Sequence, residues 1–109
     1  MRDFDIPWIE PWKQVIDGET LVAELHRELC ATHPLHGRTA VPLGQRINCD
    51  DVLFHLPEGP HPFAIVHLTW TVETDPEFPW TTFFANANEL KERLRRHTQE
   101  WATRTRSSN

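Results

Sequence analysis

Histidines and acidic residues are the side chains in this sequence whose types suit chemistry. Seven histidines are present, and an imidazole can act as a general acid or base or bind a metal. His67 lies within one apolar run, whereas Asp50 and Asp51 precede another, and a neighbouring carboxylate would orient the imidazole for proton transfer. The structural alternative is that the two acids form a turn and that His67 is a hydrogen-bonded core residue.

Recognisable motifs for metal binding or nucleophilic catalysis are absent. The sequence has no HExxH, CxxC, GxSxG or glycine-rich phosphate-binding motif. His33 and His36 are separated by Pro34, which disfavours their presentation from one helix. Cys30 and Cys49 stand nineteen positions apart, and we expect buried thiols, neither joined in a disulfide nor reactive. The sequence therefore assigns no catalytic residue, and we expect no metal ion and no cofactor.

A segment with two tryptophans and three acids follows the apolar run that contains His67. Tryptophan is enriched at the energetic centres of protein interfaces, and acidic side chains steer a basic partner toward a surface. The alternative is a solvated loop whose tryptophans pack into the core. The candidate binding residues are Trp70, Glu73, Asp75, Glu77, Phe78 and Trp80 of this segment, together with His67 and Asp51.

The chain length and the apolar content fit one small domain. With 109 residues, of which 39% are hydrophobic, we expect a single domain over residues 1–109 with one core. No apolar run approaches the roughly 20 residues of a membrane helix. The first twelve residues carry acids where a signal peptide carries basic residues. We therefore expect a cytoplasmic protein that has no membrane partner.

Charge is unevenly distributed along the chain. The formal net charge is −5; residues 1–90 hold five basic and fourteen acidic side chains, and residues 91–109 hold six basic and two acidic ones. The late cations oppose the dipole at the end of a predicted helix. A nucleic-acid-binding protein would instead carry interleaved basic and aromatic residues on its main face, so we expect no nucleic-acid partner.

The periodicity and the turn residues predict two helices and several strands. Leu21, Leu25 and Leu29 recur at four-residue steps before Pro34, which predicts a helix over about 18–32. Two apolar runs around the stretch 57–62, rich in proline and glycine, predict a β-hairpin. The other expected elements are an aromatic and proline-rich N-terminal arm at 1–16, an irregular edge strand within 33–50, a strand at 80–85, a helix capped by Asn86 or Asn88, and a frayed basic tail at 103–109.

The register of the hairpin decides which side chains share a face of the sheet. We expect Leu56 to pair with Phe63 across the turn, which makes His55 and His67 point to opposite faces. Both faces are then largely apolar, whereas a wet outer face would show a polar residue at every second position. We therefore expect the second face to be covered by the N-terminal arm, by a second copy of the chain or by a partner.

The order of the elements predicts an α+β fold. Strands joined by short turns pair antiparallel, so we expect an antiparallel sheet of three to four strands around the central hairpin. The two helices are expected to pack together on one face of this sheet.

Three segments of the sequence resemble a family of small stand-alone bacterial proteins. They are the turn HPLHGR at 33–38, the segment DDVLF at 50–54 and the segment VHLTW at 66–70, which an acidic, proline-containing loop follows. The resemblance spans about residues 33–84. It implies a compact cytoplasmic single-domain protein without an assigned activity, so it lends this chain no catalytic residue.

These observations support two hypotheses of different classes. The leading one is a non-catalytic, immunity- or adaptor-like protein that binds a protein partner through the Trp-rich acidic loop and the outer sheet face. The alternative is a small-molecule-binding protein or a small enzyme that uses a pocket around His67 and Asp51. Self-association as a homodimer through the outer sheet face is a third hypothesis.

Overall fold

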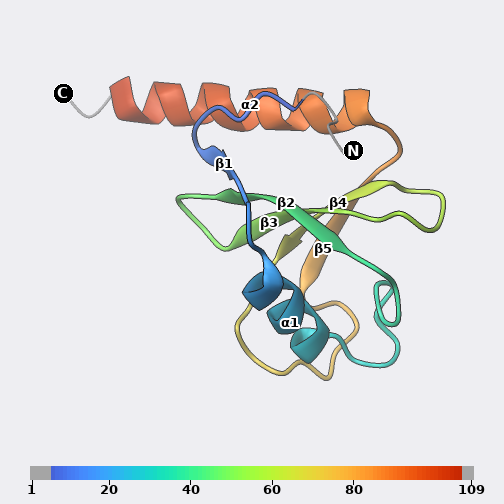
Figure 1. Cartoon of the computed structure of the whole chain (residues 1–109). Helices are drawn as coiled ribbons and strands as arrows, with labels where there is room; N and C mark the ends of the chain where they lie inside the picture. Colours follow the sequence, from blue (N-terminus) through green and yellow to red (C-terminus); the bar gives the residue numbers. More distant parts are fainter. Residues whose placement is uncertain (1–5, 107–109) are drawn as a thin grey trace.

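Five strands and two helices form the chain over residues 6–106, which the computed structural model describes (Figure 1). The strands make one antiparallel sheet in the order β1-β2-β3-β4-β5. The expected α+β fold with an antiparallel sheet is therefore confirmed, but the sheet has five strands where three to four were predicted. The elements are β1 (Trp12–Gln14), α1 (Glu19–Glu28), β2 (Val41–Arg46), β3 (Asp51–His55), β4 (Phe63–His67), β5 (Trp80–Phe84) and α2 (Ala87–Arg106).

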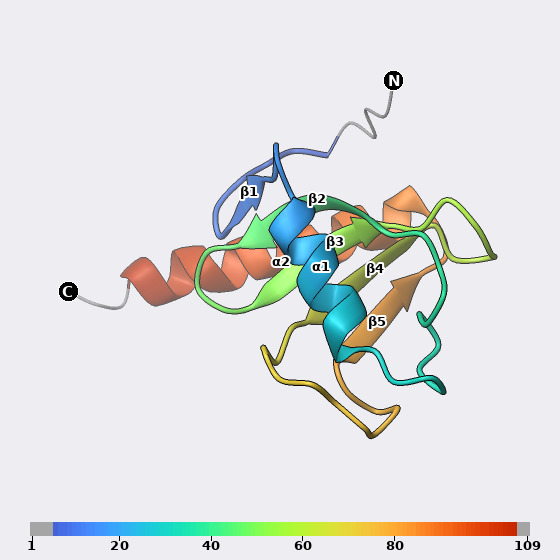
Figure 2. The same ribbon diagram turned by 60° about the horizontal axis from the view of Figure 1, so that its bottom comes forward.

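The helices lie on opposite faces of the sheet, so the prediction that both pack on one face is wrong. In Figure 2, α1 lies in front of the sheet and α2 lies behind it. The reason is that both sheet faces are apolar and each needs a helix to exclude water. The α1 face buries Leu21, Leu25, Leu29, Val52, Phe54, Ala64 and Val66, whereas the α2 face buries Leu53, Phe63, Ile65, Phe84, Leu90 and Leu94.

The central hairpin is shifted by one residue from the expected register. His55, and not Leu56, pairs with Phe63, and Asp51 pairs with His67. Leu56 instead closes the loop, because its N–H donates to the carbonyl of Pro62 at 2.7 Å. A shift of one residue exchanges the two faces of a strand, so His55 and His67 lie on the same face and not on opposite ones.

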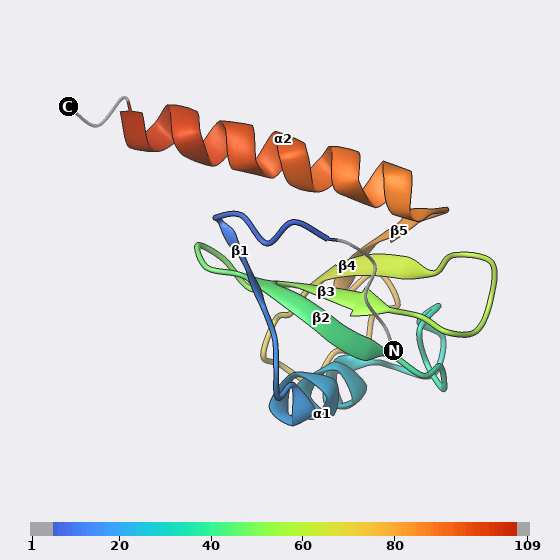
Figure 3. The same cartoon turned by 45° about the horizontal axis from the view of Figure 1, so that its top comes forward.

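The N-terminal arm contributes the extra strand and closes one side of the core. Trp12 of β1 is 2% exposed and packs on the α2 face, and Figure 3 shows the stretch before β1 running between α2 and the sheet. Trp8 of this stretch lies over Gly44 of β2, where a Cβ would overlap its ring. The arm and α2 together thus cover the face that the sequence left open; residues 1–5 of the arm lie outside the described residues.

Pairing with β1 makes β2 an internal strand, whereas the sequence predicted an edge strand. A proline cannot donate to a sheet ladder. Pro42 is nevertheless tolerated in β2, because β1 pairs only with residues 44–46 of this strand. The register of β2 against β3 shifts between Pro42 and Gly44. The irregularity that the prolines and glycines predicted is therefore present, but inside the sheet.

Helix α1 ends earlier than predicted, at Glu28, whose buried carboxylate fixes the loop after β4. Glu28 Oε1 accepts hydrogen bonds from the N–H and the hydroxyl of Thr69 at 2.8 and 3.1 Å, and Oε2 accepts from the N–H of Trp70 at 2.7 Å. Trp70 has a φ of 58°, which is uncommon for a bulky residue. The carboxylate thus stabilises an otherwise unfavourable turn at the start of the Trp-rich loop.

Helix α2 begins with a side-chain cap and continues past the expected end. The N-cap residue Asn86 accepts through Oδ1 from the N–H of Glu89 at 2.9 Å, and Glu89 Oε1 accepts from the N–H of Ala85, the residue before the cap, at 3.1 Å. The helix extends to Arg106, so residues 103–106 are helical where fraying was predicted, and residues 107–109 lie outside the described residues.

Among residues 6–106, no helix has the length and apolar character needed to cross a membrane.

Truncation of a core leucine on either face tests the three-layer arrangement. We expect Leu25→Ala and Leu90→Ala each to lower the free energy of unfolding by about 2–5 kcal/mol, because each leaves a cavity between a helix and the sheet. Urea unfolding measures the change. The matched control is Ile16→Ala, because Ile16 is exposed and its truncation should stay within about 0.5 kcal/mol. A Leu90→Ala variant as stable as this control would contradict packing of α2 on the sheet.

Removal of the Glu28 carboxylate should destabilise the fold. In Glu28→Ala the N–H groups of Thr69 and Trp70 lose their acceptor, and an unsatisfied donor of this kind costs about 1–3 kcal/mol. The change is measured by urea unfolding, with His26→Ala on the exposed side of α1 as the control. Equal stability of the two variants would show that the carboxylate does not fix the loop.

Candidate functional site

One row of polar and aromatic side chains crosses the α2 face at the end of the sheet. Trp12 pairs with Arg46, Asp51 pairs with His67, and His67 pairs with Trp80 in the strand registers. Arg46 Nη1 donates to Asp51 Oδ2 at 3.2 Å. This bond connects the first pair to the residues of β3, β4 and β5. We call this set the cross-sheet row; its members are Trp12, Arg46, Asp51, His67 and Trp80, one from each strand.

Asp51 orients the imidazole of His67. The distance from His67 Nδ1 to Asp51 Oδ1 is 2.7 Å, and the side chain of His67 is 44% exposed, compared with 16% for Asp51. An ionised carboxylate can only accept a hydrogen bond, so Nδ1 is the donor in this contact and Nε2 is the ring nitrogen left for a ligand. The arrangement therefore presents an oriented, accessible imidazole, and it overturns the alternative in which Asp51 only forms a turn and His67 is a core residue.

A second histidine, His97 of α2, lies above the row. Its Nδ1 accepts a hydrogen bond from Trp12 Nε1 at 3.1 Å, and the two rings stack with centroids 6.0 Å apart. Burial lowers the pKa of His97, and the positive charge of Arg46 lowers it further. Because an indole can only donate, His97 is neutral and carries its proton on Nε2.

A cleft of about 280 Å³ opens between α2 and this end of the sheet. Trp80, which is 57% exposed, forms one wall; its ring lies 6.3 Å from that of His67 and stacks on Phe78 at 5.5 Å. Arg93 adds a positive charge and lies over the ring of Phe84 at 5.5 Å. The lining residues are Asp51, Ile65, His67, Trp80, Thr82, Arg93 and His97.

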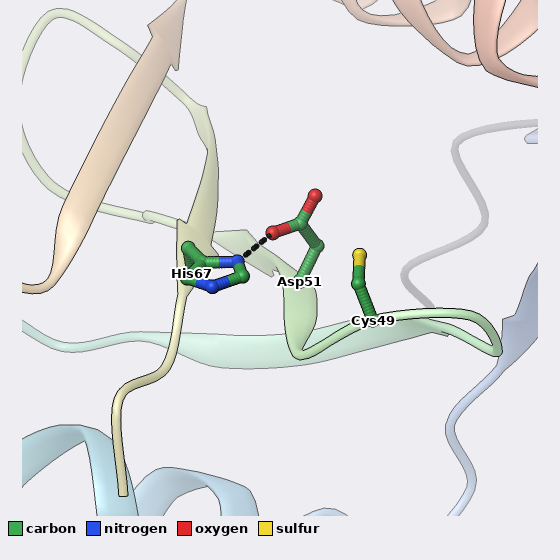
Figure 4. Close-up of side chains that lie close together, drawn as sticks. All are labelled: Cys49, Asp51 and His67. Atoms are coloured by element: carbon green, nitrogen blue, oxygen red, sulfur yellow. Dashed lines mark hydrogen bonds and ion pairs between the residues drawn. The ribbon is translucent and has the colours of Figure 1, made fainter. Parts of the chain in front are cut away.

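Cys49 brings a thiol to the same place. One donor atom each of Cys49, Asp51 and His67 lie within 4.8 Å of one another (Figure 4). Cys49 lies in the short loop 47–50 between β2 and β3. Two backbone hydrogen bonds hold this loop, from the N–H of Ile47 to the carbonyl of Pro11 at 2.7 Å and from the N–H of Leu68 to the carbonyl of Asp50 at 3.0 Å.

The cysteine is not arranged as the nucleophile of a triad. In such a triad the carboxylate and the nucleophile contact opposite nitrogens of the imidazole. Figure 4 shows the Cys49 thiol and the Asp51 carboxylate on the same side of the His67 ring, that of Nδ1. Burial also raises the pKa of Cys49, which favours the thiol over the nucleophilic thiolate.

The predicted site residues separate into two groups. His67, Asp51 and Trp80 belong to the cross-sheet row, with Phe78 stacked on Trp80. Trp70 is bonded to Glu28 of α1, away from the cleft. The three acids lie in the loop between β4 and β5, where Asp75 Oδ1 accepts from the N–H of Glu77 at 2.9 Å and Glu73 is half-buried.

Several residues of the site were missed from the sequence. Cys49 lies in the four-residue loop before Asp51, and Arg46 directly precedes this loop. Their closeness to Asp51 in the sequence is a signal that could have identified both. Trp12, Arg93 and His97 are distant in sequence, and no motif marks them. Of the other histidines, His33 is buried with both ring nitrogens bonded to backbone groups, Leu35 N–H and the Pro79 carbonyl, which is a structural role.

Comparison of the chain with protein-family models, with curated proteins and with solved structures finds no match. The assignment of function therefore rests on the geometry of the site alone.

The lowered pKa of His97 predicts a specific dependence of stability on pH. Because the folded state opposes protonation of this ring, its contribution to stability is complete above the ordinary histidine pKa of about 6.5 and is lost as the pH falls below it. We expect the free energy of unfolding, measured with urea, to fall less between about pH 7.5 and about pH 5 in His97→Gln than in the native protein. The reason is that a glutamine can accept the hydrogen bond from Trp12 without titrating. An equal loss in both proteins would contradict a neutral, bonded His97.

Proposed function

We propose that the protein binds a small organic anion in the cleft around His67 and Asp51. The observation that carries the proposal is the half-exposed imidazole of His67, fixed by a 2.7 Å hydrogen bond to Asp51 and bordered by the exposed ring of Trp80. Ligand pockets typically combine an apolar wall with a few oriented polar groups. Here Trp80 and Ile65 supply the apolar surface.

The charge balance of the cleft favours an anion. The carboxylate of Asp51 is already paired with Arg46 and bonded to His67, so it offers little net negative charge to a ligand. Arg93 contributes a guanidinium, which binds carboxylates and phosphates through paired hydrogen bonds. The Thr82 hydroxyl and the Nε2–H of His97 are further donors among the lining residues.

A protein partner remains a second candidate, supported by the exposed side chains of the Trp-rich loop. Trp70, Val72 and Trp80 are 44%, 60% and 57% exposed, and the neighbouring acids would favour a basic partner surface. The two helices cover both sheet faces, so the loop alone would form the contact, for a partner or for a second copy of the chain.

For either candidate the proposed compartment is the cytoplasm, where cysteines such as Cys30 and Cys49, both unpaired, stay reduced.

A ligand screen by thermal unfolding tests the anion proposal. In buffer freed of metal ions by a chelating resin, we expect some members of a panel of small organic carboxylates and phosphate esters, including benzoate, to raise the melting temperature in proportion to their occupancy. His67→Gln and Arg93→Gln should each weaken the binding of any hit about tenfold or more, because each removes a polar contact worth about 1.4 kcal/mol.

Two control variants separate this proposal from the alternative. Arg95→Gln removes an exposed guanidinium of α2, and Trp70→Ala removes an exposed side chain of the loop. Neither residue lines the cleft, so neither substitution should change the affinity. No hit at millimolar concentration, or hits that the cleft variants do not weaken, would contradict the proposal. Capture of a partner that is lost in Trp70→Ala but kept in His67→Gln would instead support the loop as the binding surface.

A further inference from the structure

We propose that Cys49, Asp51 and His67 form a binding site for a divalent metal ion of the zinc type, with a fourth coordination position open to the cleft. The three side chains offer one sulfur, one oxygen and one nitrogen donor within 4.8 Å of one another. This inference goes beyond the anion proposal, because the site is defined by protein ligands and needs no organic molecule to form.

The donor set matches the chemistry of zinc. Zinc is bound in proteins by cysteine thiolate, imidazole nitrogen and carboxylate oxygen, and a site with three protein ligands leaves one position for water or substrate. Zinc bond lengths of about 2.0–2.3 Å in a tetrahedron place the donor atoms about 3.3–3.6 Å apart. The observed spacing, from 2.7 Å between Asp51 and His67 to at most 4.8 Å, brackets this value.

The surroundings of the three ligands are those of a supported metal site. Arg46 donates to Oδ2 of Asp51 and leaves Oδ1, the oxygen that faces His67, for the ion; outer hydrogen bonds of this kind orient metal ligands. Asp51 and His67 begin and end paired strands, and the backbone bonds of loop 47–50 position Cys49. The ligands are therefore presented by the sheet and by one short, bonded loop.

The protons of the site balance on binding. The ion replaces the hydrogen bond between His67 and Asp51, the imidazole proton moves from Nδ1 to Nε2, and the Cys49 thiol releases its proton to solvent. One thiolate and one carboxylate then neutralise the two positive charges of the ion.

Two of the three ligands, Asp51 and His67, line the cleft, and no fourth His, Cys, Asp or Glu of the described residues belongs to the cluster. His97 also lines the cleft, but its Nδ1 is engaged by Trp12 and its Nε2 carries the proton. Water, or the proposed anion, would therefore complete the coordination. Such a position is the feature that distinguishes a zinc site with chemistry from a closed structural one.

Titration of the metal-free protein with Co²⁺ tests the site, because Co²⁺ takes the place of zinc and its bond to a thiolate gives a charge-transfer absorption band. We expect one equivalent to produce this band and one equivalent of Zn²⁺ to remove it. Cys49→Ser should abolish the band, and Asp51→Asn and His67→Gln should each weaken Co²⁺ affinity about tenfold or more, since each loses a ligand.

Matched controls come from the neighbouring residues of the same types. Cys30→Ser replaces the other cysteine, and Asp50→Asn replaces the exposed acid beside Asp51; both should keep the band and the native affinity, and circular dichroism checks that every variant is folded. Absence of a thiolate band in the native protein, its persistence in Cys49→Ser or its loss in Cys30→Ser would overturn the proposal. The titration contains no organic anion, and the anion screen contains no metal ion, so either proposal can fail without the other.

Discussion

The pairing of Asp51 with His67 across β3 and β4 is the contact on which the candidate site depends. It exists because His55 pairs with Phe63 at the other end of the same hairpin, and the strands then carry both residues to one edge of the α2 face. Arg46 on one side and Trp80 on the other extend the pair into the cross-sheet row. A shift of one residue would turn either Asp51 or His67 toward α1 and separate them.

The apolar character of both sheet faces explains why this row lies in a cleft. Each face requires a helix, and α2 therefore crosses the sheet with Leu90 and Leu94 buried against it. The same helix carries Arg93 and His97 to the end of the sheet where the cross-sheet row lies. The hydrophobic packing that stabilises the fold thus also places a guanidinium and a neutral imidazole over His67.

The elements with strong local patterns could be predicted from the sequence, whereas the site could be predicted only in part. The leucine spacing of α1, the capping residue Asn86 and the two hairpin strands were recognisable. The register was not, because several prolines in loop 56–62 allow more than one closure and no short turn motif fixes it. Asp51 and His67 were identified as a pair by residue type, but the contribution of Cys49 depends on the turn of loop 47–50, which spacing alone does not define.

The protonation state of His67 tests the central claim most directly. Two-bond ¹H–¹⁵N correlation spectra of the ¹⁵N-labelled protein at neutral pH report which imidazole nitrogen carries the proton. We expect the Nδ1–H form in the metal-free native protein, because Asp51 accepts that hydrogen bond, and a shift toward the Nε2–H form in Asp51→Ala. An Nε2–H form in the native protein, or a tautomer unchanged in Asp51→Ala, would contradict the claim that Asp51 orients the imidazole.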